Sequence, residues 1–281
     1  MTNIICLKFI FYYLYSRFLE TKLIKYIQMK KIALITGATA GIGEAIAKRM
    51  AKEGCKIIIT GRRKDRLDKL KSEIETIYKT DVITLEFDVR QYTEVEHAIT
   101  SLPESWQDID ILVNNAGLAV GLNPIHEGVV DDWERMIDTN IKGLLYVTRV
   151  ITPRMVARKS GHIVNLCSIA GKEVYANGNV YCATKHAVDA LTKGMRIDLL
   201  PYNIRVTQVC PGAVETEFSL VRFKGDKDRA DKVYQGFTPL DADNIADAVY
   251  YAVSQPAHVD VQDMLVLCTA QAGGTIFHKN Q

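Results

Sequence analysis

A glycine-rich turn joins the first apolar run of this chain to a helical pattern. Residues 32–36 form a short apolar run, and apolar residues then recur at helical spacing from residue 42 to residue 50. Between them lie glycines at a G-x-x-x-G-x-G spacing. Glycines at a strand-to-helix turn let a pyrophosphate approach the backbone N–H groups at the helix N-terminus. The motif therefore predicts a dinucleotide site with contacts from Gly37, Thr39, Gly41, Ile42 and Gly43.

Strand-like and helix-like segments alternate along the rest of the chain. Short apolar runs predict strands at 32–36, 56–60, 82–89, 109–113, 162–166, 204–209 and 264–267. Amphipathic spacing predicts helices at 42–50, 62–78, 94–102, 131–158, 181–200 and 241–253. This alternation favours right-handed βαβ crossovers. We therefore expect an α/β protein with a Rossmann-type, doubly wound parallel sheet of about seven strands, with helices on both faces. A single domain would span residues 29–281.

The first 28 residues differ in composition from the rest. Residues 4–19 are apolar and aromatic, but Lys8 and Arg17 interrupt them. The segment is shorter than the roughly 20 clean apolar residues of a spanning helix, and no small-residue cleavage site follows it. It is either an interfacial anchor or sequence translated upstream of a true start at Met29, and we favour the second interpretation. We accordingly expect a cytoplasmic protein without a membrane partner.

The net charge and the cysteine spacing argue against a nucleic-acid-binding protein, a disulfide-bonded protein and a metal protein. The net charge of +2 indicates no strong attraction to nucleic acid. The six cysteines are scattered and form no Cys-x-x-Cys pair. We therefore expect reduced thiols, no disulfide framework and no metal site.

The end of the second predicted strand carries two arginines, Arg62 and Arg63, and no acid. An Asp or Glu at this place would hold the ribose 2′-hydroxyl of NAD, whereas arginine can pair with the 2′-phosphate of NADP. The alternative is that both arginines only decorate the start of a helix, although cations oppose the helix dipole there. We expect them to select NADP(H).

Tyr181 and Lys185 lie four residues apart in a predicted helix, and Ser168 stands thirteen residues before the tyrosine. Residues i and i+4 share one helix face, so the phenol and the ammonium can address one point. A nearby ammonium favours the phenolate and lowers the pKa of the phenol from about 10. The pair predicts a general acid/base for an alcohol or carbonyl oxygen. By itself, Tyr-x-x-x-Lys is also common as an exposed helical pair.

Together these motifs resemble a known family. The glycine turn, Asn114-Asn115-Ala116-Gly117, Asn140, Ser168, Tyr181 and Lys185 occur in the order typical of short-chain dehydrogenases/reductases. Within that family, Thr60-Gly61-Arg62-Arg63 and Gly178-Asn179-Val180-Tyr181 resemble the bacterial enzymes that act with NADP on 3-hydroxy acids such as serine and allo-threonine. The resemblance also implies a homotetramer.

The resemblance implies a role for each residue. Tyr181 would be the acid/base, Lys185 would lower its pKa and hold the nicotinamide ribose, and Ser168 would hydrogen-bond the substrate oxygen. Asn140 would hold a water in a proton relay, unless it is an ordinary polar residue of a helix. The remaining implied cofactor contacts are Asp88 and Val89 at the adenine, Asn115, Ala116 and Gly117 after the fourth strand, and Pro211, Gly212, Val214 and Thr216 over the nicotinamide.

The loop expected at residues 217–230 carries several cations, among them Arg222 and Lys224. Its charges and Gly225 suit a mobile lid. We expect Arg222 or Lys224 to meet the carboxylate of a 3-hydroxy acid when the lid closes. The alternative is an ordinary solvated loop.

The sequence thus predicts an NADP-dependent enzyme that interconverts a 3-hydroxy acid and its 3-oxo acid by hydride transfer. A reductase of 3-oxoacyl thioesters or of other carbonyl substrates would use the same residues. A protein that senses NADPH without turnover is an alternative of another class, but it has no use for the phenol–ammonium pair. A membrane-anchored reductase of lipids would require residues 1–28 to be a real anchor.

Overall fold

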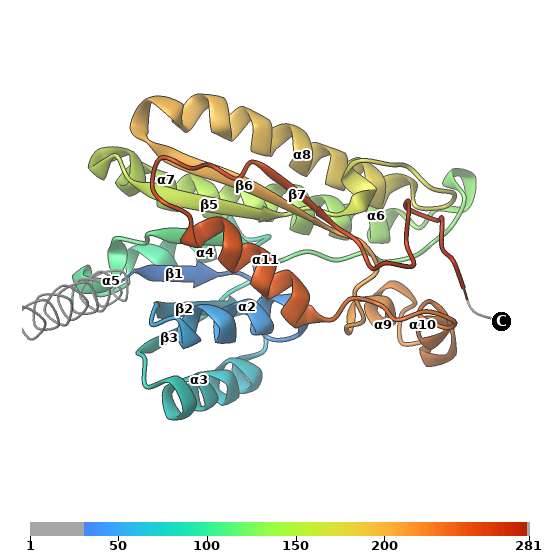
Figure 1. Ribbon diagram of the computed structural model, residues 1–281, viewed down its shortest axis with the longest axis horizontal. Helices are drawn as coiled ribbons and strands as arrows, with labels where there is room; N and C mark the ends of the chain where they lie inside the picture. The colour runs from blue at the N-terminus through green and yellow to red at the C-terminus, as the bar shows by residue number, and fades with distance from the viewer. Residues whose placement is uncertain (1–30, 280–281) are drawn as a thin grey trace, which may run out of the picture.

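The computed structural model describes residues 31–279, which form one seven-stranded parallel sheet between layers of helices (Figure 1). The strand order is β3-β2-β1-β4-β5-β6-β7. The order reverses between β1 and β4, so a crevice opens there at the carboxyl ends of the strands. The expected α/β class and doubly wound sheet are confirmed. The interpretation of residues 1–28 concerns a segment that lies outside the described residues.

The strands are short and the central ones are fully buried. All four residues of β1 and of β4 are buried, as expected for strands covered on both faces. Every pair of neighbouring strands is parallel. The bounds are β1 (Ile32–Ile35), β2 (Lys56–Gly61), β3 (Val82–Glu86), β4 (Ile111–Asn114), β5 (Gly161–Leu166), β6 (Ile204–Pro211) and β7 (Asp263–Val266).

One face of the sheet is covered by α2 (Gly41–Lys52), α3 (Lys64–Tyr78) and α11 (Ala242–Ser254). Each has apolar residues at helical spacing, such as Ile46 and Met50 on α2, which pack into one core cluster with β1 and β2. Helices α2 and α11 lie side by side across this face (Figure 1).

The other face is covered by α4 (Tyr92–Thr100), α7 (Leu144–Arg158) and α8 (Asn179–Leu199). The helical stretch expected at 131–158 is α6 (Val130–Ile137), a π-helical segment η2 (Asp138–Gly143) and then α7. The short helices are α5 (Glu104–Gln107) and the 3₁₀ turns η1 (Ile125–Glu127), η3 (Ile169–Gly171) and η4 (Leu200–Tyr202).

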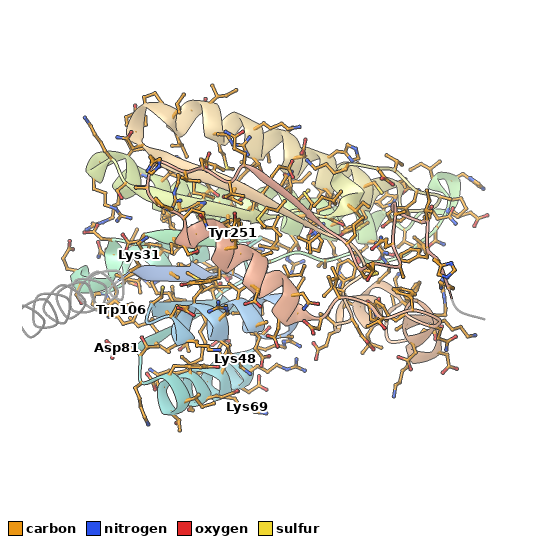
Figure 2. The ribbon with its side chains drawn as sticks, viewed as in Figure 1. Lys31, Lys48, Lys69, Asp81, Trp106 and Tyr251 are labelled. Atoms are coloured by element: carbon orange, nitrogen blue, oxygen red, sulfur yellow. The ribbon has the colours of Figure 1, made fainter. Side chains whose placement is uncertain are left out.

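The two ends of the sheet differ. Trp106 of α5 lies at the amino end of the strands (Figure 2), nearly buried, with the Lys56 ammonium 4.3 Å from its ring centroid. The carboxyl end is bordered by α9 (Phe218–Arg222) and α10 (Lys227–Lys232) (Figure 1). The lid segment, residues 217–230, is therefore not the expected loop. It forms two short helices, and Lys224 and Gly225 make the turn between them with positive φ angles.

Two other elements have bounds that differ from the predicted ones. The third strand ends at Glu86 and not at residue 89, because β2 ends at Gly61, the partner of Glu86. The next helix after β2 begins at Lys64 rather than at residue 62. Within residues 31–279, no helix combines the length and the apolar character needed to cross a membrane.

Candidate active site

A cleft of about 660 Å³ lies at the carboxyl ends of the strands. It brings together side chains from the glycine turn, the ends of β2, β4, β5 and β6, helix α8 and the lid segment. Of the residues predicted from the sequence, those lining the cleft are Gly37, Thr39, Gly41, Ile42, Gly43, Arg62, Arg63, Asp88, Val89, Asn115, Ala116, Gly117, Ser168, Tyr181, Lys185, Pro211, Gly212, Val214, Thr216 and Arg222. Asn140 and Lys224 do not line it.

The glycine turn is shaped by close backbone packing. Gly37 and Gly41 have φ angles of +66° and +55°, a conformation that L side chains rarely adopt. A Cβ on Gly43 would collide with the Asn115 amide and would lie 2.5 Å from the Gly37 carbonyl oxygen. Asn115 in turn donates to the carbonyl oxygens of Thr36 and Gly37 at 2.8 and 3.2 Å. The turn is thus held open as a cradle for a phosphate group.

The arginines after β2 differ in surroundings. Arg63 donates from Nε and Nη2 to the Thr39 hydroxyl at 3.2 and 2.8 Å, which brings its guanidinium beside the glycine turn. Arg62 is more exposed and lies 3.7 Å from the Asp88 carboxylate. A third arginine, Arg66, contacts Glu217 together with Arg63. Arg63 and Arg66 thus share one carboxylate, and of the two arginines Arg63 lines the cleft.

Tyr181, Lys185 and Ser168 meet at the ends of β5 and α8. Tyr181 and Lys185 are only 8% and 7% exposed, although both line the cleft. The Lys185 ammonium donates to the Leu166 carbonyl oxygen at 2.9 Å and lies 6.0 Å from the phenol ring centroid. Ser168 begins the η3 turn, where its hydroxyl accepts from the Ala170 N–H at 3.1 Å.

Burial is the main influence on the phenol of Tyr181. It raises the pKa of Tyr181 to about 12, and the Arg222 guanidinium and the Ser168 hydroxyl oppose that rise. Burial also lowers the pKa of Lys185, since a desolvated ammonium is disfavoured. That Lys185 lowers the phenol pKa stays a prediction.

Asn140 has no side-chain access to the cleft. It is 2% exposed within the π-helical segment. Its Oδ1 accepts from the Leu118 N–H at 2.8 Å, and its Nδ2 donates to the Leu118 carbonyl at 2.8 Å and to the Thr184 hydroxyl at 3.0 Å. The side chain therefore ties the segment after β4 to α8, while its role in a proton relay stays a prediction.

The side chains of Arg222 and Lys224 have different partners. The Arg222 guanidinium lies 4.9 Å from the Tyr181 ring centroid, and its Nη2 donates to the Tyr175 hydroxyl at 2.7 Å. Its Nε is buried without a partner. Lys224 instead pairs with Asp132 at 2.8 Å, on the outer side of the turn between α9 and α10. Of these two lid residues, Arg222 is therefore the one that presents its cation next to the phenol.

Sequence reasoning missed several residues of the cleft. Tyr175 and Phe218 flank Arg222, and Gln271 and Phe277 contribute from the C-terminal segment. Gln271 accepts from the Ala213 N–H at 2.9 Å, so this segment supports the loop after β6. No motif marks these positions, because they reach the cleft only through the path of the folded chain.

The sheet order, the glycine turn, and Ser168, Tyr181 and Lys185 in one cleft together define a dinucleotide-binding dehydrogenase. A family profile described as short chain dehydrogenase matches residues 31–226. The chain belongs to this family, which confirms the resemblance read from the sequence and the expectation of an oxidoreductase acting on hydroxyl groups.

Individual relatives are more specific than the family profile. The chain is 48% identical over 251 residues to the NADP-dependent 3-hydroxy acid dehydrogenase of Salmonella typhi, covering 89% of this chain and 100% of the relative. It is 42% identical to the serine 3-dehydrogenase of Agrobacterium fabrum over 87% of this chain and 96% of the relative. A solved closed form of a serine dehydrogenase complexed with NADP+ matches with a TM-score of 0.83 and 46% identity, covering 89% of this chain and all of that one.

Proposed function

We propose that this protein is an NADP-dependent dehydrogenase that interconverts a 3-hydroxy acid and its 3-oxo acid. The observation that carries the proposal is Arg222, a cation 4.9 Å from the Tyr181 ring with a buried, unpartnered Nε. Arg222 lines the cleft, and a guanidinium there suits a carboxylate. The names of the relatives at 48% and 42% identity point to the same substrate class.

The cofactor would be held by the turn and the arginines. Gly37, Gly41 and Gly43 would hold the pyrophosphate at the N-terminus of α2, and Arg63 would pair with the 2′-phosphate. Asp88 and Val89 would flank the adenine, and Lys185 would hold the nicotinamide ribose. When bound, the cofactor supplies or accepts the hydride.

Each remaining group has a defined task. Arg222 would bind the substrate carboxylate, and Ser168 would hydrogen-bond the reacting oxygen. Tyr181 would give a proton to that oxygen during reduction and take it back during oxidation. Because its pKa is raised to about 12, the phenol is protonated at neutral pH and is ready for the reductive direction. Its burial beside Phe218, whose ring centroid is 5.7 Å away, excludes water from the transfer.

A substrate panel tests the proposal. Serine, allo-threonine and 3-hydroxypropionate would be assayed with NADP and with NAD, and acetoacetyl thioesters with NADPH and NADH. We expect turnover of the free hydroxy acids with NADP. Turnover confined to the thioesters would contradict the carboxylate assignment, and equal kcat/KM with both cofactors would contradict NADP selection.

The oligomeric state and the compartment are proposals that rest on family resemblance. We propose a homotetramer in the cytoplasm. Analytical ultracentrifugation tests the oligomeric state, and a monomer would contradict it. Fractionation of the source cells tests the compartment, and recovery of the protein with the membranes would contradict it.

A further inference from the structure

Glu217 connects the cofactor side of the cleft to the lid segment. Its carboxylate lies 2.8 and 3.1 Å from Arg66 Nη1 and 3.2 Å from Arg63 Nη1. Both arginines belong to the start of α3, whereas Glu217 is the residue directly before α9. The three residues therefore join two elements that are more than 150 positions apart in the sequence.

The opposite end of α9 carries Arg222. Between Glu217 and Arg222 the helix spans only five residues, and Val221 donates its N–H to the Glu217 carbonyl at 3.0 Å. Other contacts also hold this helix. The Ser219 hydroxyl lies 2.7 Å from the Tyr234 hydroxyl, and Arg222 donates to the Tyr175 hydroxyl at 2.7 Å. The Gly121 N–H donates to the Arg222 carbonyl oxygen at 3.0 Å, so the position of α9 does not depend on the ion pairs of Glu217 alone.

The ion pairs of Glu217 lie at the surface. The exposed fractions of the side chains are 42% for Arg63, 40% for Arg66 and 47% for Glu217. Exposed ion pairs are weak and exchange readily. The hydrogen bond from Arg66 nevertheless holds the pKa of Glu217 below its usual value, so the carboxylate is ionised at neutral pH.

We propose that Glu217 occupies the place of the 2′-phosphate on Arg63 and Arg66, and that a bound 2′-phosphate displaces its carboxylate. A phosphate monoester carries nearly two negative charges at neutral pH, compared with one on a carboxylate. It therefore binds the two arginines more strongly than Glu217 does, whereas the uncharged 2′-hydroxyl of NAD cannot displace the carboxylate. Arg66 becomes a further specificity residue. This inference rests on the NADP part of the proposed function.

Binding of two small nucleotides tests the displacement without turnover. Adenosine 2′,5′-bisphosphate carries the 2′-phosphate and adenosine 5′-monophosphate does not. Calorimetry on the full chain should give Glu217→Gln a roughly three- to tenfold higher affinity for the bisphosphate and an unchanged affinity for the monophosphate. Arg66→Gln should weaken the bisphosphate alone.

Asp65→Asn is the matched control. It removes one exposed carboxylate from the same end of α3 without freeing either arginine, so both affinities should stay at the wild-type value. An equal gain in Asp65→Asn and Glu217→Gln would mean that net charge alone acts, and would overturn the displacement.

The two nucleotides also separate the inference from the proposed function. If the wild type binds the two nucleotides equally, the NADP proposal itself fails. If it prefers the bisphosphate but Glu217→Gln changes nothing, only the Glu217 inference fails.

Discussion

Two cations, Lys185 and Arg222, lie near the ring of Tyr181 in different surroundings. Lys185 is buried and donates to a backbone carbonyl, and Arg222 stacks near the ring. A buried phenol keeps its proton, and the nearby guanidinium moderates that effect. At the scale of single residues, the proton chemistry of this site therefore depends on how deeply the lid segment buries the phenol as well as on the Tyr–Lys spacing.

Replacement of Tyr181 by Phe tests the acid/base assignment. The variant keeps the ring and its contact with Phe218 but loses the hydroxyl. We expect kcat to fall by at least about a hundredfold, the lower end of typical acid/base contributions. NADPH affinity, measured by nicotinamide fluorescence, should stay near the wild-type value. Retained turnover would refute the mechanism.

Arg222→Met tests two proposed effects of Arg222: binding of the substrate carboxylate and lowering of the Tyr181 pKa. Loss of a charge-assisted hydrogen bond should raise KM for serine about 10- to 100-fold. Because the guanidinium lowers the phenol pKa, its removal should raise that pKa further. Alcohol oxidation needs the phenolate, so the rising limb of kcat/KM against pH should move to higher pH. Arg222→Lys should restore part of both effects.

Lys224→Met is the control for that experiment. Its loss leaves the buried carboxylate of Asp132 without its ion-pair partner. We expect a lower free energy of unfolding, measured in urea, with an unchanged KM for serine. A raised KM in Lys224→Met, or a normal KM in Arg222→Met, would contradict the assignment of the carboxylate to Arg222.

At the scale of elements, the turn between β1 and α2 depends on the absence of a side chain. Gly43→Ala would push a methyl group into the Asn115 amide and the Gly37 carbonyl. We expect NADPH affinity to fall at least about tenfold, because a turn that shifts no longer presents its N–H groups to the pyrophosphate. Fluorescence titration measures the loss.

Gly194→Ala serves as the control for a glycine inside a helix. Gly194 lies within α8, and nothing stands within 4 Å of the Cβ that would be added. Replacement by alanine should stabilise the protein by about 0.5–1 kcal/mol and leave cofactor affinity unchanged. Equal behaviour of the two variants would mean that the turn has no special need for glycine.

On the scale of the whole molecule, the sheet buries a histidine. His162 of β5 is 2% exposed, its Nε2 lies 2.7 Å from the Thr207 hydroxyl, and its Nδ1 has no partner. The Thr207 hydroxyl donates to the Val261 carbonyl oxygen, so Nε2 carries the proton that Thr207 accepts. Burial and the nearby cation of Arg205 lower the pKa of His162 to about 3. The folded protein therefore holds a neutral imidazole.

This depressed pKa predicts acid sensitivity. Below about pH 6.5 the unfolded chain binds a proton at His162 that the folded chain rejects, so the free energy of unfolding falls as pH falls towards 3. The slope from this group approaches about 1.4 kcal/mol per pH unit. Urea unfolding between pH 5 and 6.5 should give a flatter profile for His162→Gln, and no flattening for exposed His258→Gln. A wild-type profile already flat in that range would contradict the prediction.

Much of the fold and of the cofactor site could be predicted from local signals. Short apolar runs mark buried strands, a period of 3.6 marks helices, and a glycine with positive φ is demanded by the turn itself. The predicted bounds were wrong where a distant partner decided them: β3 ends at Glu86 because its neighbour β2 ends at Gly61. The π-helical segment was not predicted, and its Asn140 bonds with Leu118, 22 residues away, leave no local signal in the sequence.

The amino-acid sequence by itself determined the parallel α/β fold, the glycine cradle and the family, since these depend on residue types at short, regular spacing. Only the tertiary structure decided between Arg222 and Lys224, brought Glu217 to Arg63 and Arg66, and made burial the main influence on Tyr181. The physical reason is that charge interactions and desolvation act through space. They follow the path of the folded chain, and residues far apart in sequence become neighbours only there.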